Sequence, residues 1–192
     1  MMSATPTKDA LELFKEKNKE ILRLDIRFHR HPLPVPKIIV KRTFLKYLVL
    51  LKKINEFLKE NHPVFVFAPT IESCELLYHF LSLFFLKGNY VHSKKNDRSK
   101  TIELFREGKY KYLVTTSVLE RGVTVKDLQV IIFNSDHGVY DKGTLIQISG
   151  RVGRKIDAPD GEVIFIASKK TKEMEEACEN IVESNKALQN ML

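Results

Sequence analysis

Short runs of β-branched and aromatic residues alternate with amphipathic helical stretches from residue 44 to the end of the chain. The runs are VFVFA (64–68), NYVH (89–92), YKYLVTT (110–116), VIIFN (130–134) and EVIFIA (162–167). The helical stretches are 46–60, 71–87, 97–107, 142–151 and one that carries Met174 to Leu188, and Gly88 is expected to end the second of them. Strands that alternate with helices form a parallel sheet covered on both faces. The sequence therefore predicts an α/β fold with ligands beyond the carboxyl ends of the strands.

The first 43 residues follow a different pattern. Residues 22–29 alternate strictly between apolar and polar, which is typical of a half-exposed strand. HPLPVPK (31–37) has proline at every second position, which excludes a helix and predicts an extended, semi-rigid connector. We therefore expect residues 1–43 to be an extended segment and linker, and residues 44–192 to be the folded domain.

Charge and composition limit the class of protein. Lys and Arg number 32 against 24 Asp and Glu, and the net charge of +8 favours a polyanionic partner such as nucleic acid or an anionic membrane surface. No apolar run approaches the ~18 residues that a membrane span requires. Cys74 and Cys178 have no metal-binding or disulfide spacing and are expected to act as small buried hydrophobes. His29 and His31 lack a third ligand nearby, so we predict no metal site.

The segment QISGRVGR (147–154) holds the most specific arrangement of charge. On a helix, Gln147, Arg151 and Arg154 lie at i, i+4 and i+7 and share one face. Guanidinium groups bind phosphate well because their donors form a rigid fork and stay charged. The alternative is a solvated helix end whose arginines complement the helix dipole. Two glycines in this stretch weaken that alternative, because a plain surface helix gains nothing from them.

Three hydroxyl residues, TTS (115–117), follow the third apolar run, and Gly122 comes soon after them. At the carboxyl end of a strand, hydroxyl and backbone N–H groups can contact phosphate oxygens. A glycine lets the backbone approach a ligand closely. The alternative is a strand end with a helix cap, followed by a short helix that glycine closes.

Four segments, in this order and at these separations, resemble motifs III, IV, V and VI of superfamily 2 helicases. They are SAT (3–5), VFVFAPT (64–70), TTSVLERGVTV (115–125) and QISGRVGR (147–154). The resemblance implies a RecA-like three-layer sandwich, the helicase C-terminal domain, preceded in residues 1–43 by the end of the motif III region and an interdomain linker. Within the superfamily the chain looks most like the ComFA-type competence ATPases, and less like the PriA and RecG helicases.

The resemblance also implies a nucleotide site shared with an N-terminal RecA-like domain. Arg154 would be the arginine finger, Arg151 would reach the γ-phosphate, and Gln147 would help to align it. Gly122 and Thr124 would lie on the nucleotide side of motif V. Many relatives carry Asp where this chain has Thr124, which removes the support for a ribose contact there.

On the nucleic-acid side, the resemblance implies that a group of small polar residues holds the backbone of single-stranded DNA. They are Thr70, His92, Ser93, Thr115 and Thr116. Lys94 and Lys95 would add positive charge there. Ser3 and Thr5 match a motif that couples nucleotide state to strand binding, with helix capping as the alternative.

Two parts of an ATP-hydrolysing site are missing from the sequence. There is no phosphate-cradling loop with lysine, and no Asp-Glu dipeptide that would hold Mg²⁺. The string GVYDKGT (138–144) has the right glycine spacing but has threonine in the lysine position. We therefore expect ATP and Mg²⁺ to be bound mainly by a separate N-terminal domain, with no cofactor on this chain alone. Because SAT begins the chain, we also expect a truncated protein that is inactive by itself.

The leading hypothesis is thus the C-terminal motor domain of an ATP-dependent DNA translocase in competence DNA uptake. Its partners would be single-stranded DNA, its own N-terminal RecA-like domain and membrane-associated uptake proteins. It would be cytoplasmic, with a peripheral place at the inner face of the cell membrane as a variant. The alternatives are a non-catalytic module that binds nucleic acid or protein on an inherited fold, and a fragment of a PriA-like or RecG-like repair helicase. The ComFA-type cysteine-rich region near the N-terminus has no counterpart in this chain.

Overall fold

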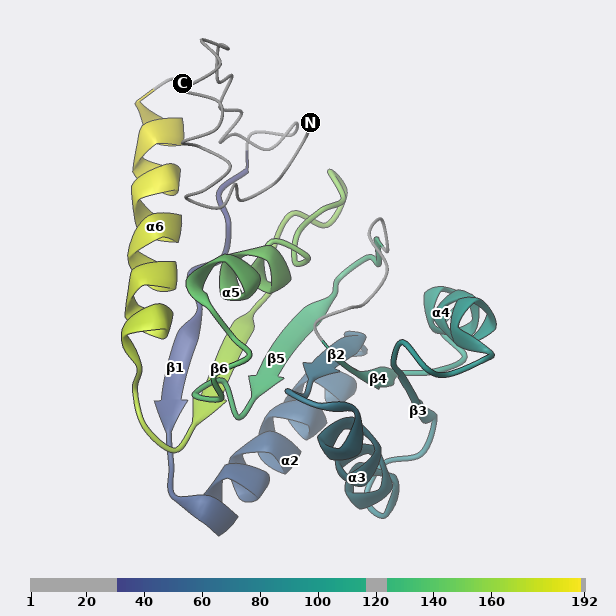
Figure 1. Cartoon of the computed structure of the whole chain (residues 1–192). Coiled ribbons are helices and arrows are strands. Elements are labelled where there is room, and N and C mark those ends of the chain that lie inside the picture. The colour runs from purple at the N-terminus through teal and green to yellow at the C-terminus, as the bar shows by residue number, and fades with distance from the viewer. Residues whose placement is uncertain (1–30, 117–123, 191–192) are drawn as a thin grey trace, which may run out of the picture.

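The computed structural model describes residues 31–116 and 124–190. Within them, a six-stranded sheet has helices on both faces (Figure 1), and its strands lie in the order β1-β6-β5-β2-β4-β3. The strands are β1 (Lys37–Val40), β2 (Val64–Phe67), β3 (Gly88–Val91), β4 (Tyr112–Thr115), β5 (Gln129–Phe133) and β6 (Val163–Ala167). The helices are α2 (Thr43–Lys59), α3 (Ile71–Ser82), α4 (Arg98–Arg106), α5 (Lys142–Ser149) and α6 (Lys172–Gln189). Every neighbouring pair is parallel, so the predicted α/β fold with a mostly parallel sheet is confirmed.

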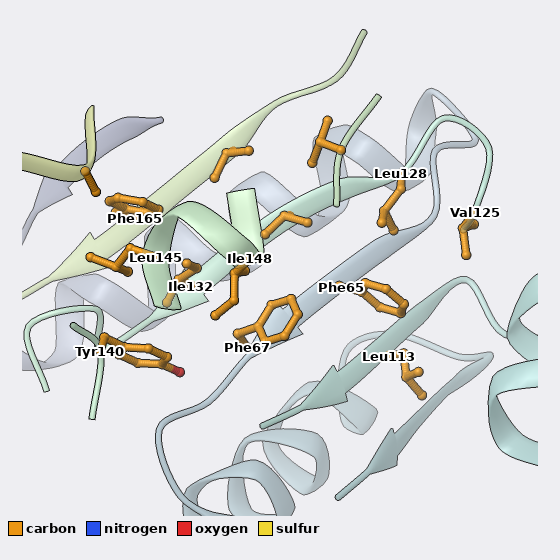
Figure 2. Close-up of a cluster of buried hydrophobic side chains, with 14 of the residues drawn as sticks. Phe65, Phe67, Leu113, Val125, Leu128, Ile132, Tyr140, Leu145, Ile148 and Phe165 are labelled. Atoms are coloured by element: carbon orange, nitrogen blue, oxygen red, sulfur yellow. The ribbon is translucent and has the colours of Figure 1, made fainter. Parts of the chain in front are cut away.

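The four central strands explain why the apolar runs are continuous. Every residue of β2, β4, β5 and β6 is buried, because each strand has helices on both faces and a neighbour on both sides. One core forms where α4, α5 and α6 cover the sheet, and Figure 2 shows Leu145, Ile148 and Phe67 among its members. The second core forms under α2 and α3 on the opposite face. This face also buries Cys74, whereas Cys178 on α6 is only partly buried.

The connections that follow β2 and β5 run to opposite faces of the sheet. The chain leaves β2 into α3 on one face of the sheet and leaves β5 into α5 on the other face. Because β2 and β5 are hydrogen-bonded neighbours, the connections diverge at their carboxyl ends. Such a point is where open α/β sheets bind ligands. The fold therefore indicates a site at the loops that follow β2, β3 and β4 and at the turn after α5.

The second helix is shorter than the sequence predicts. The expected helix 71–87 ends at Ser82, and Gly88 begins β3 instead of ending a helix. The left-handed residue is Lys87, with φ 61°. A Cβ atom on Gly88 would lie 1.9 Å from the ring of Tyr112 on the neighbouring strand. Glycine is therefore required at this position by close packing between strands, which helical periodicity cannot reveal.

The helix that carries the basic segment also ends early. It ends at Ser149, so Arg151 and Arg154 lie in the turn that follows, and the prediction that they share a helix face with Gln147 is wrong. The Ser149 hydroxyl donates to the Leu145 carbonyl at 2.7 Å. Beyond it, Gly153 has φ 65°, a conformation that favours glycine and ends a helix.

Part of the expected linker belongs to the sheet. Lys37–Val40 forms the edge strand β1 and pairs with β6 over Ile164 to Ala167. The boundary expected between residues 43 and 44 thus falls after a strand of the domain. Residues 31–36 form no helix, as the prolines at every second position predict. The strand expected over 22–29 lies outside the described residues.

Lys46 joins helix α2 to the ends of two strands. This side chain is 8 % exposed, and its ammonium donates to Asn134 Oδ1 and to Ser168 Oγ at 2.7 Å. Asn134 follows β5 and Ser168 follows β6, so one lysine holds three elements together.

Replacing Lys46 with methionine should therefore destabilise the domain. Methionine keeps most of the aliphatic stem but leaves two oxygen acceptors without this donor, which costs about 1–3 kcal/mol. The melting temperature should fall by about 2–4 °C per kcal/mol for a chain of this size. Lys52→Met is the matched control, because Lys52 is 77 % exposed on the same helix and its ion pair with Glu56 is long at 3.9 Å. Equal melting temperatures for the two variants would contradict this role of Lys46.

Candidate functional site

Three neighbouring strands present loops at one edge of the sheet. The carboxyl ends of β2, β4 and β3 lie side by side in that order. Thr70 follows β2, Thr116 follows β4 and His92 follows β3. Neighbouring strands are about 4.8 Å apart, so these residues form a row across the edge. The sheet thereby gathers the residues predicted for nucleic-acid binding, although they are far apart in the sequence.

Thr70 is the N-cap residue of helix α3 and is exposed. Its Oγ1 accepts a hydrogen bond from the Ser73 N–H at 3.1 Å, and Ser73 Oγ accepts one from the Thr70 N–H at 3.0 Å. This reciprocal capping box orients the first turn of the helix toward the edge. The positive end of the helix dipole and its free N–H groups favour an anion there.

His92 is turned inward. It is 8 % exposed, its Nε2 lies 3.0 Å from Glu75 Oε1 on α3, and its Nδ1 accepts from the Lys94 N–H at 3.3 Å. A carboxylate can only accept and a backbone N–H can only donate, so both contacts are satisfied by the neutral ring with its proton on Nε2. The imidazole therefore holds the loop that follows β3 against helix α3.

Lys95 closes the same loop. Its ammonium donates to Asn89 Oδ1 at 2.9 Å and to the Tyr90 carbonyl at 2.8 Å, and it lies 3.9 Å from the centre of the Tyr90 ring. Burial lowers the pKa of Lys95. This lysine is thus a structural cation, whereas Ser93 and Lys94 before it are exposed.

The two threonines after β4 are buried. Thr115 is 1 % exposed, and its hydroxyl donates to the Thr116 carbonyl at 3.2 Å. Thr116 is 6 % exposed. Of the residues predicted to hold nucleic acid, the exposed ones are Thr70 and Ser93, whereas His92, Thr115 and Thr116 lie mainly beneath the surface.

The basic turn after α5 carries Arg151, and Arg154 follows it directly. Arg151 is 8 % exposed, and its Cζ lies 5.9 Å from the centre of the Phe67 ring, at the end of β2. Burial and, to a smaller extent, the positive charge of Arg154 together lower the pKa of Arg151 to about 10. The turn thus carries positive charge beside the carboxyl end of β2.

Arg154 and Gln147 flank this buried arginine at the surface. Arg154 is exposed, and its Nε donates to the Gly150 carbonyl at 2.8 Å, which fixes the side chain against the end of α5. Gln147 is exposed on the last turn of the helix. The predicted nucleotide-site residues thus lie at the end of α5 and in the segment that follows it. Arg151 is buried there, and Arg154 is exposed to solvent.

Other predicted site residues lie outside the described residues. They are Ser3, Thr5 and Gly122. Thr124, the first described residue after the motif V segment, is partly buried. In residues 31–116 and 124–190, no three His, Cys, Asp or Glu side chains gather in a way that could hold a metal ion. No helix in the same ranges is long and apolar enough to cross a membrane.

Sequence reasoning missed the residues that support the site. Glu75 and Asn185 carry no motif, and they act on residues 17 and 152 positions away. Periodicity places both on helices without indicating these contacts. Glu75 makes its contact because His92 turns inward, and Asn185 makes its contact because residues 31–36 run beside α6.

Residues 45–156 match the family "Helicase conserved C-terminal domain". This match covers more than half of the chain, includes the strands that form the edge and contains the basic turn. The chain therefore belongs to the helicase C-terminal domain family, of superfamily 2, with the RecA-like fold.

The chain is also similar to individual members of this superfamily. It is 32 % identical over 191 residues to competence protein ComFA of Bacillus subtilis, which covers 96 % of this chain and 41 % of that protein. It is 29 % identical over 157 residues to UvrABC system protein B of Dehalococcoides mccartyi, which covers 79 % of this chain and 23 % of that protein. The chain thus spans less than half the length of these curated relatives.

Among solved structures, the fold is similar to S. cerevisiae Dbp5 bound to RNA and ADP BeF3. The TM-score is 0.67 at 21 % identity, over 99 % of this chain and 54 % of that chain. At this identity the likeness concerns the fold.

Proposed function

We propose that this chain is the C-terminal motor domain of an ATP-dependent DNA translocase in competence DNA uptake, and that Arg154 is its arginine finger. The observation that carries the proposal is that the segment after α5 holds one arginine buried over Phe67 and a second one exposed and fixed by the Gly150 carbonyl. Guanidinium groups bind phosphate through a rigid fork of donors and stay charged, so the segment suits an anionic phosphate. A triphosphate on a facing domain would supply that anion.

The two arginines have different parts in this proposal. Arg151, buried over Phe67, is preoriented and would contribute a fixed positive charge. Arg154, exposed and held by the Gly150 carbonyl, would reach the γ-phosphate. Gln147, also exposed, would align the finger, and Thr124 and Gly122 would lie on the nucleotide side. Fixed donors that need not reorganise are the main source of rate enhancement in phosphoryl transfer.

ATP and Mg²⁺ would be held mainly by an N-terminal RecA-like domain. This chain has no lysine-bearing phosphate loop and no Asp-Glu pair. The residues of this chain that suit a nucleotide phosphate are Arg151 and Arg154. When bound, Mg²⁺ would neutralise phosphate charge. Closure of the two domains would bring Arg154 to the phosphate, and reopening after hydrolysis would withdraw it. Ser3 and Thr5 would couple this movement to the nucleic acid.

Single-stranded DNA would cross the edge formed by the ends of β2, β4 and β3. Thr70 and Ser93 would contact its phosphates directly, together with the first turn of α3 and Lys94. His92, Thr115 and Thr116 would support these contacts from beneath the surface. This set of contacts recognises a backbone and no particular base sequence, as a translocase requires.

The competence role is supported by similarity to ComFA over 96 % of the chain. In that role the protein would be cytoplasmic, with a peripheral place beside membrane-associated uptake proteins. The similarity to UvrABC system protein B of Dehalococcoides mccartyi, at 29 % identity over 79 % of the chain, favours the same motor in a UvrABC system as the second candidate.

Salt dependence of DNA binding tests the nucleic-acid part of the proposal. The logarithm of the affinity for a single strand should fall with the logarithm of salt concentration by about 0.7 per phosphate contact. Lys94→Ala should lower this slope by about one contact, measured by fluorescence anisotropy with labelled oligonucleotides. Lys59→Ala, an exposed lysine at the end of α2, is the control and should leave the slope unchanged. An affinity that does not change with salt would contradict the proposal.

A further inference from the structure

The segment 31–36 is fastened to helix α6 mainly by the side chain of Asn185. Asn185 Oδ1 accepts from the Leu33 N–H at 2.8 Å, and Asn185 Nδ2 donates to the Leu33 carbonyl at 2.8 Å. The amide thus satisfies both backbone groups of one residue, as a neighbouring strand would. The Cys178 thiol on the same helix lies 3.7 Å from the Pro36 carbonyl and adds a weak second contact.

Leu33 also reaches the turn that carries the arginines. Its Cδ2 lies 3.8 Å from the position that a Cβ atom on Gly150 would occupy, so the leucine side chain lies beside this glycine. The Gly150 carbonyl accepts the hydrogen bond from Arg154 Nε at 2.8 Å, and the Gly150 N–H donates to the Ile146 carbonyl at 2.8 Å. Leu33 and Arg154 therefore lie beside the same glycine.

We propose that Asn185 is a positioning residue, which holds the linker on α6 and thereby sets the place of the Arg154 turn. The inference rests on the proposed function, in which Arg154 acts on a nucleotide bound to the other motor domain. Prolines 32, 34 and 36 make the segment stiff. A stiff linker carries a movement of the other domain to its anchor, so the Asn185 contact couples that movement to the finger.

The chemistry of the contact allows graded substitutions. Asn185→Leu keeps the branching of the side chain at Cγ and removes both hydrogen bonds. Asn185→Asp keeps an oxygen for the Leu33 N–H but has no donor for the Leu33 carbonyl. Asn180→Leu is the matched control, because Asn180 is exposed on the same helix.

The experiment measures ATP hydrolysis stimulated by single-stranded DNA in the natural full-length protein. For Asn185→Leu, we expect kcat to fall about tenfold, because a small displacement of a catalytic group can reduce rates up to about a hundredfold. KM for ATP and the affinity for single-stranded DNA should stay within about twofold, since the binding surfaces are untouched. Asn185→Asp should be intermediate, and Asn180→Leu should match the wild type.

Arg154→Ala in the same assay separates the two proposals. If Arg154→Ala abolishes turnover and Asn185→Leu does not lower kcat, the positioning role is refuted and the arginine finger stands. If Arg154→Ala retains turnover, the proposed function fails first. If Asn185→Leu lowers melting temperature, kcat and DNA affinity together, Asn185→Asp decides. A selective loss of kcat in Asn185→Asp supports positioning, and a parallel loss of all three refutes it.

Discussion

Replacing Arg154 with alanine in the full-length protein is expected to lower DNA-stimulated ATP hydrolysis by about 10³-fold or more. Arginine fingers contribute roughly 10³ to 10⁵ in rate, because they place a fixed positive charge where charge develops in phosphoryl transfer. Arg154 is exposed and bonded to the Gly150 carbonyl, so its loss should not disturb the core. The rate is measured with saturating ATP and single-stranded DNA, together with the affinity for a labelled oligonucleotide.

Two further variants make this result specific. Lys155→Ala removes the next positive charge along the chain, which is also exposed, and should retain nearly wild-type turnover. Arg154→Lys keeps a charge but loses the bidentate fork, so it should remain strongly impaired. DNA affinity should change less than about threefold in all of them. Substantial turnover by Arg154→Ala would remove the basis for a motor and favour a non-catalytic binding module.

The second large effect is expected at His92, where two amide substitutions should behave differently. Asparagine places its amide near the position of Nδ1 and can still accept from the Lys94 N–H. Glutamine places its amide near Nε2 and can contact only Glu75. In His92→Gln the Lys94 N–H loses its acceptor, so the loop that presents Ser93 and Lys94 is no longer held in place. We expect binding of single-stranded DNA to weaken by about tenfold to a hundredfold, because charge-assisted contacts between this loop and a phosphate are worth about 1.5–3 kcal/mol.

His92→Asn should bind DNA within about threefold of the wild type. Anisotropy titrations at one fixed salt concentration measure both variants, and thermal melting shows whether each remains folded. A loss of the same size in both variants, with unchanged melting temperatures, would instead place the DNA contact on the imidazole ring itself. This outcome would contradict the view that His92 acts from beneath the surface.

Much of the fold follows from local pattern. The buried strands β2, β4, β5 and β6 were predicted as continuous apolar runs, because a strand covered on both faces has no polar positions. The amphipathic stripes predicted α2 and α6 for the same kind of reason. At Gly88, prediction failed because of a contact between distant residues. Gly88 is required by the ring of Tyr112, a residue of the neighbouring strand, and no local rule contains that ring.

For the candidate site, residue types were readable from the sequence and their exposure was not. The arginines, Gln147 and the hydroxyl residues at the end of β4 could be named in advance because guanidinium and hydroxyl groups suit phosphate. Thr70, His92 and Ser93 were named from the resemblance to superfamily 2 helicases. Which of them meets solvent depends on the path of each side chain. His92 turns inward because Glu75 and a backbone N–H satisfy both of its nitrogens.

The sequence by itself determined the order of strands and helices, the family and the chemical character of the basic segment, since these depend on neighbouring residues and their spacing. Tertiary structure alone decided that Arg151 is buried and Arg154 presented, that Lys95 is a structural cation and that Asn185 fastens the linker. These features arise from contacts across up to 152 positions, and such contacts exist only after the sheet has brought its loops together.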